Sequence, residues 1–129
     1  TNGCFDVIHA GHINLLKFCK EIGKIVVVGL NTDNSIKKLK GNDRPINNLQ
    51  NRIAVLEELN CVDFIVAFDE LTPINLIKEL NPNMIVKGSD YKKNNVVGYD
   101  YIKKKGGKVV IYRIRDSLSS SKIIKSIQW

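Results

Sequence analysis

Two histidines near the start of the chain have the spacing of a ligand-binding pair. His9 and His12 are three residues apart with Gly11 between them, and the apolar residues after His12 recur at helical spacing. The sequence therefore predicts a glycine-bearing loop that opens a helix over residues 13–22. The start of a helix presents unpaired backbone N–H groups and the positive end of the helix dipole. This position, with two imidazoles beside it, favours binding of an anion and above all of a phosphate.

Two simpler interpretations of this histidine pair stay open. One is a helix cap with a second, partly exposed histidine, which is the commoner outcome for such pairs. The other is a zinc site, but zinc needs further ligands, and the sequence contains neither a Cys-x-x-Cys motif nor a second cluster of histidine and glutamate. We therefore expect no zinc ion at this pair of histidines.

Length and charge limit the class of protein. The chain has 129 residues, which fits one domain over 1–129, either alone or as a part of a longer chain. Its formal net charge of +7 predicts attraction to anions. The sequence shows no helix with arginines on one face and no alternation of aromatic and basic residues, so we expect no binding to nucleic acid.

The cellular compartment is indicated by what the sequence lacks. Its three cysteines are odd in number and widely spaced, which suits a reducing environment. No stretch approaches the roughly 20 apolar residues of a membrane span, and no signal peptide is visible. We expect a cytoplasmic protein that does not contact a membrane.

Apolar runs alternate with helical patterns along the chain. The sequence predicts strands over 24–30, 62–68, 84–86 and 108–113, and helices over 13–22, 31–38, 49–59, 72–80 and 97–105, with a last helix that begins at 119–121. Continuous apolar strands that alternate with helices indicate an α/β fold, a Rossmann-like open parallel sheet of about five strands with helices on both faces. We interpret Asn2-Gly3 as a turn, so the first strand is expected before Thr1, at the centre of the sheet.

Polar segments follow each expected strand. They cover residues 3–12, 31–44, 69–70, 87–91 and 115–121. Ligands of open parallel sheets bind beyond the carboxyl ends of the strands. Imidazole, lysine, arginine and serine groups from separate loops at this edge predict a nucleotide site.

Motifs in the same order resemble the heptose 1-phosphate nucleotidyltransferases, the ADP-heptose synthase type within the cytidylyltransferase-like nucleotidyltransferase superfamily of the HxGH type. The resemblance is carried by Thr1-Asn2-Gly3-Cys4-Phe5-Asp6, His9-Ala10-Gly11-His12, Arg44-Pro45-Ile46-Asn47, Lys87-Gly88-Ser89-Asp90-Tyr91 and Ser119-Ser120-Ser121. It implies transfer of AMP from ATP to D-glycero-D-manno-heptose 1-phosphate for lipopolysaccharide biosynthesis, with release of pyrophosphate, Mg²⁺ as cofactor and a homodimer. The alternatives are a glycerol 3-phosphate or aminoalcohol phosphate cytidylyltransferase that uses CTP, and a non-catalytic nucleotide-binding domain. GTP also stays open as the nucleotide.

The resemblance assigns expected roles to individual residues. Catalytic roles fall on His9, His12 and Lys40, with Lys37 and Lys38 as alternatives to Lys40. Asp6 is expected to orient a ligand or to help hold Mg²⁺ between the phosphates. Nucleotide binding is expected of Gly3, Cys4, Phe5, Asp6, Gly11, Arg52, Lys87, Gly88, Asp90, Ser119, Ser120 and Ser121, and contact with the acceptor substrate of Asn31, Asp33 and Arg44. Plainer roles are also open: a solvated side chain for Lys40, a turn-stabilising carboxylate for Asp6, a surface salt bridge for Arg52 and helix capping for the three serines.

Overall fold

The structure, a computed structural model, describes residues 1–113 and 119–127. Within these ranges the strands are β1 (Asn2–Gly3), β2 (Val27–Asn31), β3 (Phe64–Phe68), β4 (Met84–Gly88) and β5 (Lys108–Tyr112). They pair in the orders β1-β2-β3 and β4-β5, and every pair is parallel. The parallel α/β fold expected from the alternating sequence pattern is confirmed.

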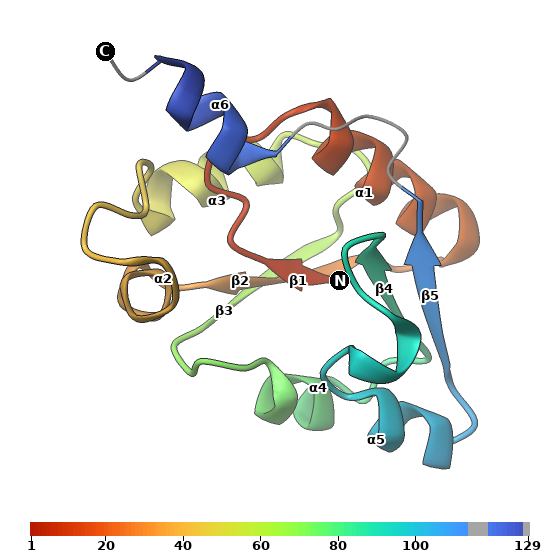
Figure 1. Cartoon of the computed structure of the whole chain (residues 1–129). Helices are drawn as coiled ribbons and strands as arrows, with labels where there is room; N and C mark the ends of the chain where they lie inside the picture. The colour runs from red at the N-terminus through yellow and green to blue at the C-terminus, as the bar shows by residue number, and fades with distance from the viewer. Residues whose placement is uncertain (114–118, 128–129) are drawn as a thin grey trace.

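Helices cover both faces of the strands. They are α1 (Ala10–Ile22), α2 (Asp33–Lys40), α3 (Leu49–Glu57), α4 (Ile74–Leu80), α5 (Tyr99–Lys104) and α6 (Ser120–Ile127), with a short 3-10 helix η1 (Lys93–Asn95). Figure 1 shows α1 and α3 on one side of the strands and α4 and α5 on the other. Across the described part of the chain, no helix has the length and apolar character needed to cross a membrane.

The described residues form three buried apolar clusters, one of which, with Leu15, Cys19, Val26 and Val86, lies between α1 and β4. On the side of α1 and α3, Val28 and Leu30 of β2 pack against Leu16 of α1, Leu56 of α3 and the ring of Phe5. On the side of α4 and α5 the cluster consists of Ile77, Ile85, Val96, Ile102 and Val109. Neighbouring residues of a strand point to opposite faces, so strands covered on both faces read as the continuous apolar runs seen in the sequence.

The predicted turn at Asn2-Gly3 is wrong. These residues form β1, in which Asn2 lies opposite Gly29 and Gly3 opposite Leu30 of β2. Pairing with a strand distant in sequence overrides the local preference of Asn-Gly for a turn. The backbone enters the left-handed region two residues later, at Phe5 with φ 48°. A Cβ on Gly3 would lie 3.2 Å from Cε2 of Phe5, so glycine allows this ring to close over the strand.

Element boundaries differ from the expected ones by a few residues. Helix α1 begins at Ala10 and not at residue 13, because the side chain of His9 caps it. Strand β4 continues to Gly88, two residues beyond its expected end, since it pairs with β5 along its whole length. Helix α4 begins at Ile74 with Pro73 as its N-cap residue, one residue after the expected proline start.

Candidate active site

The histidine pair builds the start of α1 through one nitrogen of each ring. Nδ1 of His9 accepts a hydrogen bond from the N–H of Gly11 at 3.1 Å, and Nδ1 of His12 accepts from the N–H of His9 at 3.2 Å. The two side chains thus form a reciprocal capping box, and their ring centroids are 3.9 Å apart. A neutral imidazole that accepts at Nδ1 carries its hydrogen on Nε2. Both rings therefore have an Nε2–H donor that the cap does not use.

The surroundings keep these imidazoles neutral. Burial, and then the nearby His9 and Lys40, lower the pKa of His12 from 6.5 to about 4. Burial also lowers the pKa of His9. Lys40, the last residue of α2, is close enough to act on His12, so the structure brings together the three residues with expected catalytic roles. The ring of Phe5 lies 5.1 Å from that of His12 and forms an apolar wall beside it.

The expected anion site at bare backbone N–H groups needs revision. The N–H of Gly11 is bonded to His9, and Gly11 and His12 lie inside the first turn of α1 and not in a preceding loop. The capping interpretation of the histidines is confirmed, but it leaves phosphate binding open because the cap uses Nδ1 only. Donors to an anion at this position come from the two Nε2–H groups.

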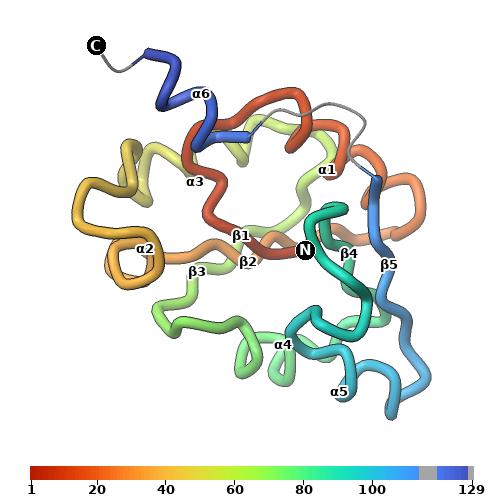
Figure 2. The backbone as a smooth tube through the Cα atoms, viewed as in Figure 1, coloured from red at the N-terminus to blue at the C-terminus, as the bar shows by residue number. Residues whose placement is uncertain are grey.

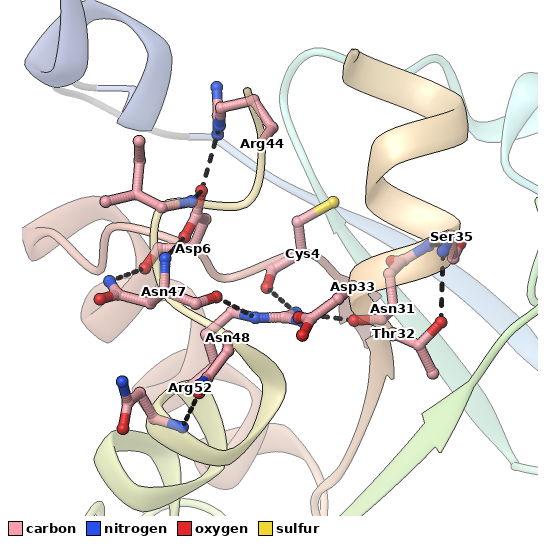
Figure 3. A network of polar contacts seen from close by, with 12 residues as sticks. Cys4, Asp6, Asn31, Thr32, Asp33, Ser35, Arg44, Asn47, Asn48 and Arg52 are labelled. Carbon is pink, nitrogen blue, oxygen red and sulfur yellow. Dashed lines mark hydrogen bonds and ion pairs between the residues drawn. The ribbon is translucent and has the colours of Figure 1, made fainter. Parts of the chain in front are cut away.

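Asp6 anchors the loop that carries Arg44. One of its carboxylate oxygens accepts from the N–H of Asn47 at 2.8 Å, and the other from the N–H of Ile46 at 2.8 Å and from Nε of Arg44 at 3.1 Å (Figure 3). Burial raises the pKa of this carboxyl, but these hydrogen bonds outweigh it and hold the pKa below its usual 3.8. Both oxygens bond to protein groups, so Asp6 has a structural role, but its partners lie in a loop about 40 residues away and not in its own turn as expected.

Arg52 connects three loops below the site. It is 1% exposed. Its guanidinium donates to the carbonyls of Cys4 at 2.9 Å, Asn31 at 2.7 Å and Asn47 at 3.0 Å, and to the carboxylate of Asp33 at 2.8 Å (Figure 3). The alternative role of Arg52 as a member of a surface salt bridge is therefore wrong. Because these donors bond to protein acceptors, the geometry favours a positioning role over direct contact with a nucleotide.

The last helix reaches the site through serine. Ser119 caps α6 by accepting from the N–H of Lys122 at 3.1 Å, so the capping role is confirmed for this serine. The hydroxyl of Ser120 donates to the carbonyl of Val7, two residues before His9, at 2.7 Å. Nη1 of Arg44 is 3.5 Å from Oγ of Ser121. The first part of the expected loop 115–121 lies outside the described residues.

Asn31 and Asp33, both expected to contact the acceptor substrate, differ in how accessible their side chains are. Asn31 is buried, and its side-chain amide donates to the hydroxyl of Ser35 at 3.0 Å, so it belongs to the framework. The side chain of Asp33 is 39% exposed and uses one oxygen for Arg52, which leaves the other available to a ligand.

Lys87 connects β4 to β1. Its ammonium donates to the carbonyl of Asn2 at 2.8 Å and to the side-chain oxygen of Asn2 at 3.1 Å, and it lies 4.8 Å from the centre of the Tyr91 ring. Burial lowers its pKa to about 8. Gly88 ends β4 and Asp90 is exposed in the turn that follows, so no contact in the described structure joins these two to the histidines.

The roles of Asn2 and Asn47 were not predicted, although both stand inside the motifs that carry the family resemblance.

The described residues of this site do not form a set of metal ligands. The described residues contain no group of three or more His, Cys, Asp and Glu that could hold a metal ion. Asp6, expected to help hold Mg²⁺, uses both oxygens for Arg44, Ile46 and Asn47. A divalent ion at this site would have to be held mainly by phosphates and water, as is common for Mg²⁺.

The fold and the paired imidazoles at the start of α1 are those of a nucleotidyltransferase. The chain belongs to the Cytidylyltransferase-like family, whose sequence profile matches residues 1–126.

Its relatives make this more specific. The chain is 46% identical over 127 residues to the Bifunctional protein HldE of Coxiella burnetii (strain Dugway 5J108-111), a match that covers 98% of this chain and 27% of that protein. It is 48% identical over 128 residues to the Bifunctional protein HldE of Helicobacter hepaticus, covering 99% of this chain and 26% of that protein. The chain thus spans about a quarter of the length of these curated relatives.

Solved structures agree with the fold. The lipopolysaccharide core biosynthesis protein from Thermoplasma volcanium GSS1 superposes with a TM-score of 0.71 at 32% identity, covering 91% of this chain and 94% of that one. Pantothenate synthetase from Thermus thermophilus shares the fold alone, with a TM-score of 0.59 at 18% identity, covering 96% of this chain and 63% of that one.

Proposed function

We propose that this chain transfers AMP from ATP to D-glycero-D-manno-heptose 1-phosphate, giving ADP-heptose and pyrophosphate. The observation that carries the proposal is the pair of neutral imidazoles whose Nε2–H groups stay available beside Lys40 at the start of α1. The choice of acceptor is supported by identity to the HldE proteins and to a lipopolysaccharide core biosynthesis protein. The choice of ATP over CTP or GTP rests on the resemblance of the motifs to the ADP-heptose synthase type, since the family as a whole is named for cytidylyl transfer.

The chemistry needs positioning and charge stabilisation more than proton transfer. A phosphate oxygen of the sugar attacks the α-phosphorus of the nucleotide, and the bond from that phosphorus to the bridging oxygen of pyrophosphate breaks. The attacking group is already an anion, so no general base is required. Negative charge grows on the α-phosphate oxygens and on pyrophosphate. His9 and His12 donate hydrogen bonds to these oxygens, and Lys40 adds a positive charge.

Mg²⁺ accompanies the nucleotide in this proposal. When bound, the ion neutralises part of the triphosphate charge. The protein's own contribution is the two imidazoles and Lys40, since the described residues offer no carboxylate cluster for a cation.

Arg44 is the proposed contact for the acceptor phosphate. Its guanidinium is held between Asp6 and Ser121, and its side chain is 10% exposed. A guanidinium fixed at one edge can offer its other N–H groups to a phosphate. The exposed oxygen of Asp33 is the proposed acceptor for a sugar hydroxyl.

The nucleotide lies along β1 in this proposal. Gly3 ends that strand and Cys4 and Phe5 follow it, whereas Lys87 and Gly88 end β4, with Asp90 in the next turn. A homodimer and a cytoplasmic location complete the proposal; the three free thiols suit a reducing compartment.

One assay separates the candidate functions. The protein is incubated with Mg²⁺, one of ATP, CTP or GTP, and either heptose 1-phosphate or glycerol 3-phosphate, and pyrophosphate is followed. Pyrophosphate release only with ATP and heptose 1-phosphate supports the proposal. Release with CTP and glycerol 3-phosphate supports the cytidylyltransferase alternative, and nucleotide binding without turnover supports a non-catalytic domain. Absence of both binding and turnover would overturn all three.

A further inference from the structure

An exposed aromatic ring lies at the edge of the sheet that holds the candidate active site. In the described part of the chain, the exposed aromatic rings are those of Phe64 and Tyr91, which are 60% and 47% exposed. Phe64 begins β3, at the amino edge of the strands, whereas Tyr91 follows the carboxyl end of β4. Ligands of parallel sheets bind beyond the carboxyl ends of the strands. Tyr91 is therefore the exposed ring on the ligand side.

Lys87 restricts the position of the Tyr91 ring. The N–H of Tyr91 donates to the carbonyl of Gly88 at 3.3 Å, which closes the turn after β4. The ammonium of Lys87 lies 4.8 Å from the centre of the ring, within the range of a cation–π contact. The same ammonium donates to the carbonyl and to the side-chain oxygen of Asn2. A ring attracted to a cation that β1 holds in place is more ordered than an ordinary surface tyrosine.

The ring lies near the segment that carries the histidines. Lys87 contacts Asn2 in β1, and Cys4, two residues later, is close enough to act on the charge of Lys87. This segment continues to His9 and His12 at the start of α1. Figure 2 shows the turn after β4 beside the amino end of the chain, where β1 begins. A nucleotide whose phosphates contact the histidines can therefore extend along β1 towards Tyr91.

We propose that the free face of the Tyr91 ring stacks on the base of the bound nucleotide and favours purines over pyrimidines. This inference rests on the proposed function and names the group that selects the base. Lys87 lies over one face of the ring, so the opposite face is the one open to a base. Stacking on an aromatic ring grows with the area of the partner, so a two-ring purine gains more than a one-ring pyrimidine. Stacking does not read exocyclic groups, so ATP and GTP should gain alike.

The other groups of the site do not provide this selection. His9, His12 and Lys40 are the proposed contacts of the triphosphate, which is the same in every nucleotide. The ring of Phe5 is 5% exposed and lies against His12. Arg44 belongs to the loop between α2 and α3, and Figure 1 shows these helices on the opposite side of β1 from β4. The acceptor and the base thus have separate places on the two sides of β1.

Binding measurements separate the base from the phosphate tail. ATP, CTP and inorganic tripolyphosphate, each with Mg²⁺, are titrated into the unchanged protein and into Tyr91→Leu, which keeps an apolar side chain but loses the π face. We expect the Kd for ATP to rise at least about fivefold, the Kd for CTP to rise less and the Kd for tripolyphosphate to stay the same. Tyr91→Phe keeps the ring and should bind ATP as the unchanged protein does.

Tyr101→Leu is the matched control. Tyr101 also has a lysine over its ring, with the ammonium of Lys105 at 4.6 Å, but it belongs to α5 and has no proposed contact with a ligand. This variant should leave the Kd values for ATP, CTP and tripolyphosphate unchanged. A readout without any variant is the NMR signal of the Tyr91 ring protons, which should shift when ATP is added and stay in place with tripolyphosphate.

The outcomes distinguish this inference from the proposed function. If Tyr91→Leu binds ATP as tightly as the unchanged protein, or if ATP leaves the Tyr91 ring signal in place, the base contact is overturned. Continued tripolyphosphate binding and turnover of heptose 1-phosphate would then leave the proposed function standing. If the unchanged protein binds neither ATP nor tripolyphosphate, the proposed function and this inference are both overturned.

Discussion

Each histidine of the site serves two purposes because an imidazole has two nitrogens. Nδ1 of His12 accepts from the backbone of His9 and completes the cap, whereas Nε2 is left for a ligand. Asparagine places a polar atom near the position of Nδ1, and glutamine places one near Nε2. These two substitutions therefore separate the structural role of the ring from its role in the reaction.

His12→Asn should keep most of the stability and lose activity. We expect Tm to stay close to that of the unchanged protein, because an acceptor for the His9 N–H remains. We expect kcat to fall by about 10² to 10³, since one donor to the developing charge is lost. His12→Gln should show the opposite balance, with a loss of about 1 kcal/mol in unfolding free energy and a smaller fall in kcat. Steady-state kinetics and urea unfolding measure kcat and the unfolding free energy of both variants. Equal losses in the two variants would contradict separate roles for Nδ1 and Nε2 of His12.

Stability should fall on mild acidification because of His12. Its pKa is about 4 in the folded state against 6.5 as the ordinary value, so between these values the unfolded chain binds a proton that the folded chain does not. The unfolding free energy therefore contains the whole contribution of His12 above pH 6.5, and this contribution is lost as the pH falls to about 4. Partial solvent screening reduces the decrease to about 1–2 kcal/mol.

Two other groups act in the same direction, His9 in the same pH range as His12 and Asp6 at lower pH. Burial lowers the pKa of His9 as well, so it adds to the loss of stability below pH 6.5. Asp6, whose folded pKa lies below 3.8, loses its contribution only at lower pH. Urea unfolding at pH 7, 5.5 and 4.5 should show a smaller decrease for His12→Asn than for the unchanged protein. Equal decreases would mean that His12 titrates normally.

At the residue scale, the sequence predicted which side chains lie together in the site, but it did not predict all of the groups that these side chains contact. His9, His12 and Lys40 lie together as expected, because a short motif and the helix after it fix two of them. The burial of Asp6 and Arg52 was not predictable, since their partners are far away in sequence: Arg52 bonds to Cys4, 48 residues before it. A motif shows that such a residue matters, but only the fold shows which groups it contacts.

At the scale of elements, the loops around the site depend on a few buried polar groups. Arg52 extends from α3 and holds the segments after β1 and β2 by their carbonyls, and Asp6 holds the loop that precedes α3. Backbone carbonyls inside a protein need donors. The positions of the loops therefore depend on these two side chains.

Arg52→Met should destabilise the protein strongly. We expect a loss of about 3–5 kcal/mol in unfolding free energy, because the substitution leaves buried acceptors unpaired. Arg52→Lys keeps the charge but not the planar fork, so we expect a smaller loss and a raised KM for nucleotide. Lys20→Met is the matched control: Lys20 pairs with Asp63 at the surface, and we expect a loss below about 1 kcal/mol. Urea unfolding measures all three, and a loss for Arg52→Met no larger than the control would contradict the positioning role.

The sequence placed the elements well and their ends less well. Apolar runs and helical spacing identified β2 to β5 and the helices α1 to α6 of the described residues, because these patterns reflect burial on the core side. The predicted ends of helices and strands were wrong where a capping side chain or pairing with a distant strand determines the boundary. The imidazole of His9 is an unusual cap, and β1 exists only because β2 is beside it.

At the scale of the whole molecule, the charge should help to collect substrate. The formal net charge is +7, and lysines such as Lys40 lie at the edge where the site opens. Positive fields raise the encounter rate with anions and are screened by salt. We expect kcat/KM to fall several-fold between about 50 mM and 500 mM NaCl while kcat changes little. A kcat/KM that does not depend on salt would contradict this role of the charge.

The parallel α/β architecture followed from the alternation of apolar strands and helices, but the break between β1 and β4 did not. Backbone pairing stops at β1, and the ammonium of Lys87 joins the two groups of strands through Asn2. Such a contact joins residues 85 positions apart, so no local pattern reports it.

The most direct test of the proposed function is a crystal structure with a non-hydrolysable ATP analogue and Mg²⁺. We predict that Nε2 of His9 and Nε2 of His12 each lie within about 2.7–3.2 Å of a phosphate oxygen, with the ammonium of Lys40 beside the same phosphates. A triphosphate bound elsewhere, with both Nε2 atoms facing solvent, would contradict the account.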